Sequence, residues 1–174
     1  PKLLSDYATG HIDALDSPIL GRLQASSVLF DYMMRGAERP LAQFMHGQVS
    51  TVAPVPNPLD ANMLVSSALA RARQLDQAGH DREAIDLLVA TYRMSTDHAA
   101  APCSIYGLYA ALNGRRACLW YLLGWLARGG CAPELEVEIA RRLGDIAGRL
   151  PSPDELLALE EQALRFDYEQ ALLN

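Results

Sequence analysis

The stretch LARARQLDQAGHDREAIDLLVATY, residues 69–92, decides the fold. Gly79 interrupts a helical pattern and is the residue type that most often ends a helix, and Asp81 is well suited to begin the next one. Ala72 and Ala84 lie on either side of this turn, where small side chains let two helices approach closely. After the turn, one apolar stripe at helical spacing consists of Ile85, Leu88, Val89 and Tyr92. The stretch therefore predicts an antiparallel helical hairpin.

The segments before the hairpin predict a proline-rich connector and further helices. Residues 49–59 read VSTVAPVPNPL, and their three prolines remove backbone donors and favour extended backbone. Asp60 is expected to cap the first helix of the hairpin. Further upstream, the apolar spacing predicts a helix over 3–15 and a second one over 18–36 after a Ser-Pro start, while 40–47 is long enough for a short third helix.

The segments after the hairpin predict more helices. Residues 101–129 carry large apolar side chains on nearly all sides, which predicts the central helix, or a helix pair broken at the Asn-Gly pair 113–114. Pro133 begins an amphipathic helix, and the tetrapeptide SPDE at 152–155 is a capping box that begins a last helix reaching about Leu173. The expected inward positions of the helix that Pro133 begins are Leu135, Ile139, Leu143, Ile146 and Leu150.

The pattern as a whole predicts an all-α fold. No segment of five or more residues combines sustained polar–apolar alternation with enrichment in β-branched residues, so no strand is expected. We expect a single-domain array of about seven or eight helices packed as antiparallel hairpins. Helices would occupy 1–48, the connector 49–59 and the main helical domain 60–174, together as one globular unit. With 174 residues the chain is long enough to bury its own core.

Composition and charge exclude several classes of protein. Hydrophobic residues make up 50% of the chain and the mean hydropathy is zero, which is typical of a folded globular protein. Fifteen basic against twenty-one acidic residues give a net charge of −6, with the excess in 132–174, so no nucleic-acid partner is expected. The longest uncharged apolar run has 11 residues, whereas a membrane span needs about 20, so no membrane span is expected within this chain.

Cysteine usage and the start of the chain leave the compartment open. The separations between Cys103, Cys118 and Cys131 match no zinc site, and we expect buried thiols. One disulfide bridge in an oxidising compartment is the alternative. The chain begins with Pro1 and shows no signal peptide, which leaves an upstream membrane anchor open. Both a cytoplasmic and an extracytoplasmic location therefore remain open.

No motif in the sequence predicts a catalytic, cofactor-binding or metal-binding residue. The histidines lie on different segments without a second histidine at helical spacing, so a surface or capping role is expected for each. They are His11, His46, His80 and His98. Nucleophile motifs and glycine-rich phosphate loops are absent from the sequence, and no cofactor is expected.

Four carboxylates near the C-terminus are interpreted as an exposed helix face rather than as an acid–base cluster. They are Asp154, Glu155, Glu160 and Glu161. Acidic and basic residues alternate at four-residue spacing here, as exposed helix faces commonly show. The expected pairs are Glu161 with Arg165, Glu138 with Arg142, and Asp145 with Arg141 and Arg149.

Aromatic residues gather in the apolar segment 101–129. They give the candidate interaction surface, which comprises Tyr106, Tyr109, Trp120, Tyr121 and Trp125. One interpretation is core packing, because the rings recur at helical spacing. The other is a groove or patch for a partner helix, or a dimer interface, because Trp and Tyr are common anchors at such contacts. Side-chain exposure distinguishes the two.

Two resemblances follow from these residues. The hairpin at 69–92 resembles one tetratricopeptide-type helical hairpin, although no second copy follows at a period of 34 residues. The wider order ALARARQL, DREAIDLL, LLGWLARGG, APELEVEIARRLGDI and PSPDELLALEEQALRFD is similar to the C-terminal half of a loose group of bacterial helical proteins of unknown function. Members are often membrane-anchored, with the helical part outside the cytoplasm. The resemblance implies a fold and such a location, and no activity or site residue.

The leading hypothesis is a non-enzymatic protein-interaction or scaffold module of a bacterial protein. It would hold a protein partner, or form a homo-oligomer, through the hairpin at 60–92 and the aromatic helix. The alternative is a small-molecule-binding or enzymatic helical domain, whose pocket would combine the aromatic rings with Arg115, Arg116 or His98. A third hypothesis, a structural dimer built from the last two helices, is expected if the acidic C-terminal face lies against a positive one.

Overall fold

The structure is a computed structural model that describes residues 2–39, 58–100, 105–129, 133–150 and 152–173. Within these ranges the chain forms eight helices and no strand, which confirms the all-α prediction. The helices are α1 (Lys2–Thr9), α2 (Ser17–Ala25), α3 (Ser27–Ala37), α4 (Pro58–Gln77), α5 (Asp81–Ala100), α6 (Ile105–Ala127), α7 (Pro133–Ala147) and α8 (Pro153–Leu173).

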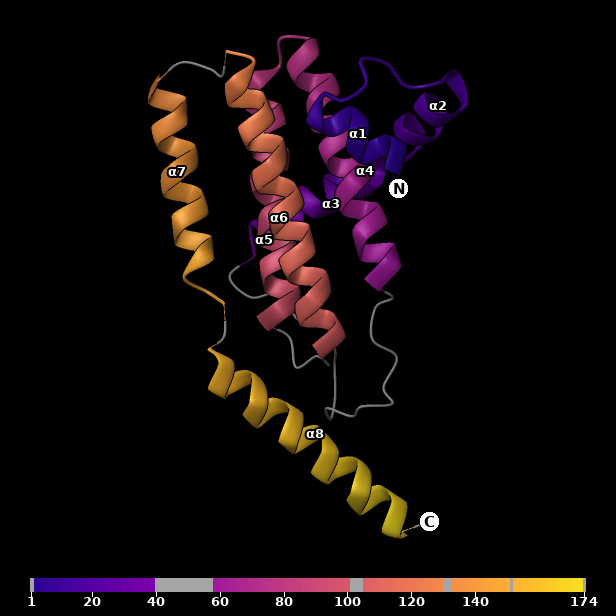
Figure 1. Cartoon of the computed structure of the whole chain (residues 1–174), viewed down its shortest axis with the longest axis vertical. Helices are drawn as coiled ribbons and strands as arrows, with labels where there is room; N and C mark the ends of the chain where they lie inside the picture. Colours follow the sequence, from indigo (N-terminus) through magenta and orange to yellow (C-terminus); the bar gives the residue numbers. More distant parts are fainter. Residues whose placement is uncertain (1, 40–57, 101–104, 130–132, 151, 174) are drawn as a thin grey trace.

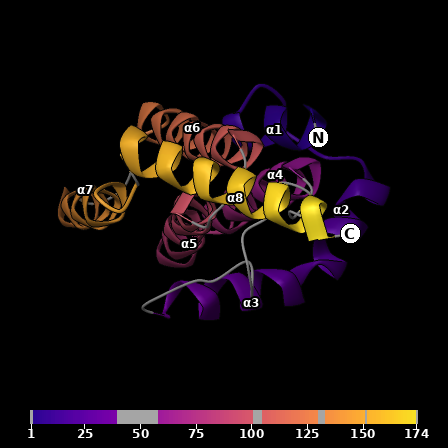
Figure 2. The same cartoon turned by 90° about the horizontal axis from the view of Figure 1, so that it is seen from below.

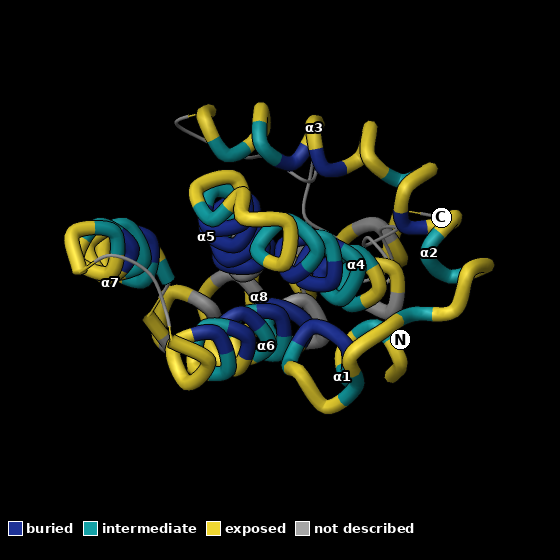
Figure 3. Tube along the Cα trace, turned by 90° about the horizontal axis from the view of Figure 1, so that it is seen from above, coloured by how far each residue is buried: buried dark blue, intermediate teal, exposed yellow. Residues whose placement is uncertain are grey.

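Helices α4 to α7 run alternately up and down, and α5 is the one that the others surround (Figure 1). It packs against α3, α4, α6 and α7, whereas α1 lies across α4 and α6. Seen from above, the buried residues concentrate in α4 and α5, while α6 shows one buried and one exposed side (Figure 3). Seen from below, α8 passes obliquely across the end of the bundle (Figure 2).

The α4–α5 hairpin forms where the sequence predicts it. Gly79 has a φ of +79°, a conformation that favours glycine, and its N–H donates to the Asp76 carbonyl at 2.9 Å. The next N–H, of His80, donates to the Leu75 carbonyl at 2.9 Å, which completes a Schellman closure of α4. Ala72 and Ala84 are both buried. The hairpin lies at the centre of the fold, which leaves little of it as an interaction surface.

Helix α1 ends six residues earlier than predicted, at Thr9, because Gly10 adopts a φ of +88°. The buried guanidinium of Arg73 on α4 then holds this end of α1 in place. It donates to the Tyr7 carbonyl and, at 2.7 Å, to the Ile12 carbonyl, and it stacks on the Tyr7 ring at 4.6 Å. A side chain from another helix thereby binds one C-terminal carbonyl of α1, that of Tyr7, and the Ile12 carbonyl just beyond the helix.

The prediction of a single helix over 18–36 is wrong, because α2 and α3 are separate helices. The chain turns at Ser26, whose N–H is shared between the Arg22 and Leu23 carbonyls and whose hydroxyl donates to the Arg22 carbonyl at 2.9 Å. Such local bonds compete with continuation of the helix. Ser17 is the first residue of α2 rather than its cap, and Pro18 lies in the first turn as predicted.

The proline-rich segment gives one further correction. Helix α4 begins at Pro58 rather than after a cap at Asp60, because proline at a first helical position loses no hydrogen bond. Residues 49–57 of the predicted connector and the predicted short helix over 40–47 lie outside the described residues.

Helix α6 is neither broken nor central, which corrects two predictions. Gly114 lies within a continuous helix and faces Ser95 of α5. A Cβ atom placed there would lie 2.4 Å from the Ser95 Oγ. The glycine therefore serves contact between helices and not a turn. The centre of the fold is α5, and α6 lies beside it with its opposite side exposed (Figure 3).

Helix α8 begins and ends as predicted, and α7 begins at Pro133 as predicted but ends at Ala147, so the expected inward position Leu150 lies beyond it. Ile139 and Ile146 of α7 are buried as expected, and Arg142 reaches across to Asp86 of α5 with an N–O distance of 2.6 Å. Three of the four expected pairs are present, because Glu138–Arg142, Arg141–Asp145 and Glu161–Arg165 form ion pairs, whereas no ion pair joins the described residues Asp145 and Arg149. Among the described helices none combines the length and the apolar character that crossing a membrane requires.

Candidate interaction surface

The inner side of α6 is built from small residues, which is why this helix sits so close to its neighbours. Gly114 faces Ser95 of α5, and Gly124 faces the Thr9 carbonyl of α1, to which an added Cβ would approach within 3.1 Å. Ala110 and Ala111 on the same helix are buried. Because the small residues point inward, most of the large side chains of α6 must point elsewhere.

Two of the five predicted aromatic residues belong to the core. Tyr121 is 2% exposed and Trp125 is 3% exposed. The Trp125 indole N–H donates to Asp76 Oδ1 at 2.8 Å, and Asp76 also lies 3.9 Å from the Arg128 guanidinium. Burial raises the pKa of the Tyr121 hydroxyl. For these two residues the core-packing interpretation is the one that the burial supports.

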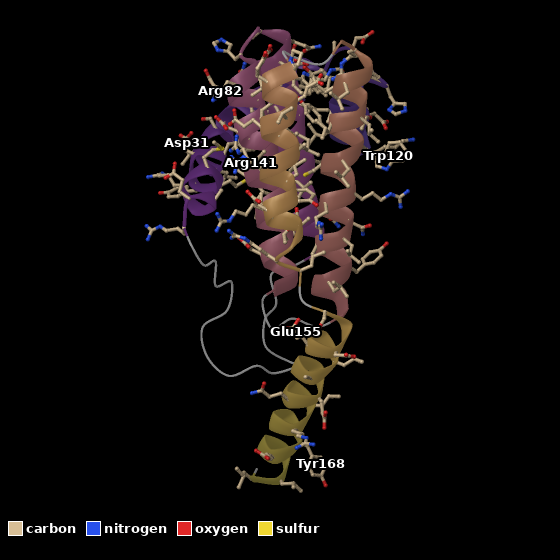
Figure 4. The ribbon with its side chains drawn as sticks, turned by 90° about the vertical axis from the view of Figure 1, so that its left-hand side faces the viewer. Asp31, Arg82, Trp120, Arg141, Glu155 and Tyr168 are labelled. Carbon is tan, nitrogen blue, oxygen red and sulfur yellow. The ribbon has the colours of Figure 1, made fainter. Side chains whose placement is uncertain are left out.

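Two of the other three aromatic residues lie at the surface. Tyr109 is 65% exposed and Trp120 is 55% exposed, so neither packs in the core. Trp120 points away from the body of the molecule (Figure 4). Tyr106 is part of α6, but its side chain lies outside the described residues. The predicted cluster thus divides into a buried pair and an exposed pair on opposite sides of one helix.

The exposed pair belongs to a longer apolar strip. We define the outer face of α6 by its exposed residues Tyr109, Leu112, Arg116, Leu119, Trp120, Leu123 and Leu126. They recur at steps of three and four residues, which places them on one side of the helix. Arg116 is the one charged residue of this face, and α6 contains no acidic residue. The face is therefore apolar with a single positive charge near its middle.

A groove continues this face toward α1 and α4. It has a volume of about 760 Å³, and Trp120 and Leu123 form part of its wall. Its polar lining residues include Ser5, Asp6, Thr9, His11, Asn113 and Arg116. The Thr9 hydroxyl lies 2.7 Å from His11 Nδ1. The groove thus brings the exposed tryptophan and several polar groups together, as the ligand-binding alternative requires.

Two polar residues named for that alternative lie elsewhere. Arg115 donates to the Tyr92 hydroxyl at 2.6 Å and stacks on the Tyr92 ring at 4.9 Å, so it fixes α6 to α5. His98 is 7% exposed on α5, where burial lowers the pKa of its imidazole, which corrects the expected surface role. Only Arg116 of the three lines the groove.

Among the described residues, the remaining histidines and cysteines form no metal site. His11 and His80 are exposed as predicted, and His46 lies outside the described residues. Cys118 is a buried thiol whose pKa is raised by burial, while Cys103 and Cys131 also lie outside those residues. The part of the chain that the structure describes contains no group of three metal-binding side chains.

Helix α8 is a second exposed surface. The predicted capping box is present, since the Ser152 N–H donates to Glu155 Oε2 at 2.7 Å and the Glu155 N–H donates to Ser152 Oγ at 3.2 Å. Hydrogen bonds to the Glu155 carboxylate from the Ser152 backbone N–H and from the Ser152 side chain lower the pKa of this carboxyl. Every described side chain of α8 is exposed, and Tyr168 lies far from the body (Figure 4). The C-terminal carboxylates that are described form a charged helix face, as the sequence indicated.

Comparison of the chain with family models, with curated proteins and with solved structures finds no match. The features that bear on function are therefore the outer face of α6 and the exposed helix α8.

Sequence reasoning named the aromatic residues and missed the strip that connects them. Leu112, Leu119 and Leu123 are about half exposed and belong to the surface as much as Trp120 does. The signal was present as two interleaved periodic sets on one helix, one that contains the small residues together with Tyr121 and Trp125, and one made mostly of leucines with Tyr109 and Trp120. Separating the two sets predicts which side of α6 faces outward.

Proposed function

We propose that this chain is a non-enzymatic protein-interaction module that binds an amphipathic helix of a partner along the outer face of α6. The observation that carries the proposal is the row of exposed large apolar residues from Tyr109 to Leu126. The row spans 17 residue steps, which corresponds to about 26 Å of helix. Contiguous apolar patches of this kind are typical of protein-interaction sites.

The shape of the face favours a helix as the bound element. Steps of three and four residues are the spacing by which one helix packs along another. Trp120 and Tyr109 supply the aromatic anchors that dominate binding energy at many interfaces. Arg116, in the middle of the row, favours an acidic residue at the matching point of the partner.

A differential capture experiment tests the proposal. The Leu123→Ser variant removes an exposed side chain of the outer face, and Val137→Ser is its matched control because Val137 is also exposed, on α7. Loss of one interface anchor weakens binding by about tenfold or more. We expect affinity purification and mass spectrometry to find the same partner with the wild-type chain and with Val137→Ser, and to lose it with Leu123→Ser. An identical protein set for all three would contradict the proposal.

A second candidate is binding of a small molecule in the groove beside Trp120. It is supported by the volume of about 760 Å³ and by the polar residues, including Arg116 and Asp6, that line the groove with the indole. Because Leu123 lines both the outer face and the groove, the two candidates differ in what the wild-type chain retains, a protein or a small ligand. A small ligand would raise the melting temperature of the wild-type chain and not that of Trp120→Ala, with no protein captured by either.

A further inference from the structure

Helix α8 has the properties of the partner that the outer face of α6 would bind. It has 21 residues, and every one of its described side chains is exposed. Leu157, Leu164 and Tyr168 are each more than half exposed and recur on one side of the helix. A helix of this length gains little stability in water without a packing partner. A surface that covers the apolar side of α8 would therefore stabilise this helix.

Charge makes the outer face of α6 a suitable cover. The sequence of α8 contains six acidic residues and one basic residue, Arg165. The sequence of α6 contains two arginines and no acidic residue. Arg115 is occupied by Tyr92, so Arg116 presents the positive charge of the outer face. Opposite charges on two apolar helices favour their association and select against pairing of like with like.

The spacing of the two rows also agrees. On α6, Leu112, Arg116, Leu119 and Leu123 follow one another at steps of four, three and four residues. On α8, Leu157, Glu161, Leu164 and Tyr168 follow one another at the same steps. When Glu161 is placed opposite Arg116, the flanking apolar residues of one helix meet those of the other. A single acidic residue within the apolar row of α8 thus matches the single basic residue within the row of α6.

We propose that α8 of one copy of this chain binds the outer face of α6 of a second copy, and the reverse, in a two-fold symmetric dimer. This inference rests on the proposed function and names its partner. Helix α8 leaves the lower end of the bundle and extends away from it (Figures 1 and 4). Each copy thus presents both an open α6 face and an exposed α8, and reciprocal exchange covers both in a closed assembly.

The sequence before α8 favours exchange over folding back. Prolines stand at positions 151 and 153, and each one biases the residue before it, Leu150 or Ser152, toward extended backbone. This bias at Leu150 and Ser152 favours α8 continuing away from the end of α7 over reversing along the same bundle. Folding back of α8 onto its own α6 remains a distinguishable outcome of the test.

Charge exchange between two variants tests the dimer with the full chain. Arg116→Glu places two acidic residues opposite each other at both contacts, and Glu161→Arg places two basic ones there. We expect each variant alone to raise the dimer dissociation constant by about tenfold or more, because close interfacial charge pairs couple strongly. An equimolar mixture of the two variants restores opposite charges at both contacts. Light scattering after size exclusion should then show a dimer for the wild type and for the mixture only.

A matched variant controls for charge. Glu169→Arg makes the same charge change on an exposed residue of α8 that lies off the row of Leu157, Leu164 and Tyr168, and it should stay dimeric. Circular dichroism confirms that each variant folds, since Arg116 and Glu161 are both exposed.

Three results would overturn the inference. A wild-type chain that is monomeric at all concentrations excludes a second copy of the chain as the partner of α6. If Leu123→Ser nevertheless loses a partner that the wild type captures, the proposed function still stands without this inference. A dimer that neither variant weakens uses another surface. A mixture that stays monomeric beside a dimeric wild type shows that Arg116 and Glu161 do not pair between copies, whereas folding back of α8 onto its own α6 predicts a monomeric wild type.

Discussion

Gly114 of α6 and Ser95 of α5 form a tight contact between the two helices. Ser95 is buried and its hydroxyl donates to the Thr91 carbonyl at 2.9 Å, so it is held in one rotamer. A Cβ at position 114 would lie 2.4 Å from Ser95 Oγ and 3.0 Å from Ser95 Cβ. Rotation of the hydroxyl relieves only the first of these contacts. The position of α6, and with it the direction of its outer face, depends on the absence of a side chain at Gly114.

We expect Gly114→Ala to destabilise the fold although alanine is the better helix former. Overpacking a buried contact costs about 1–3 kcal/mol, which exceeds the roughly 1 kcal/mol gained from helix propensity. The free energy of unfolding, measured by urea titration, should therefore fall. Gly144→Ala is the control, because an added Cβ there meets no atom within 4 Å and should stabilise α7. Equal effects of the two substitutions would show that α5 and α6 are not in close contact at Gly114.

At the scale of the element, helix ends were predictable wherever the signal is local. Gly79 and Pro133 mark the end of α4 and the start of α7 in the structure as in the sequence. Capping and left-handed glycine conformations depend on a few neighbouring residues, which a single sequence contains. The break at Ser26 was missed because an apolar stripe at helical spacing continues across it. The hydrogen bonds at Ser26 oppose continuation of the helix, but the apolar pattern of the sequence does not reveal them.

The candidate site was predictable only in part, because exposure depends on packing between helices. The sequence identified Tyr109, Trp120, Tyr121 and Trp125 as one group, and the structure separates them by burial. Which side of α6 faces α5 is decided by small residues such as Gly114, whose role depends on Ser95, a residue distant in the sequence. The apolar character of α6 on all sides concealed this asymmetry.

The start of α8 should depend on pH through its capping box. Hydrogen bonds from Ser152 lower the pKa of Glu155, so their stabilisation is complete above the unfolded-state pKa and is lost as pH falls through the lower, folded-state value. We expect the first turn of α8 to lose helical chemical shifts in acid, below the ordinary range of a glutamate carboxyl. Nuclear magnetic resonance of the Ser152 amide follows this titration.

Glu155→Gln provides the control for that titration. The glutamine side chain still accepts a hydrogen bond but does not ionise, so the Ser152 amide shift should become independent of pH in the acid range. An unchanged titration in Glu155→Gln would assign the effect to another carboxyl and contradict the prediction.

At the scale of the whole molecule, the fold places its most apolar helix at the side rather than at the centre. The central position belongs to α5, whose large side chains are buried on nearly every side. A monomer thus exposes both the outer face of α6 and the described side chains of α8 to water. Covering both lowers the free energy through the hydrophobic effect, which gives a physical reason for association.

Association along α6 should be visible in the fluorescence of Trp120. The chain has two tryptophans, of which Trp125 is buried and Trp120 is 55% exposed. When the outer face is covered, the Trp120 indole leaves water, so its emission should shift to shorter wavelength and acrylamide should quench it less. We expect both changes as the wild-type concentration rises through the dimer dissociation constant, and neither in Arg116→Glu alone. Trp120→Phe, which reports Trp125 only, should show no concentration dependence, and a dependence that persists in it would place the contact away from the outer face of α6.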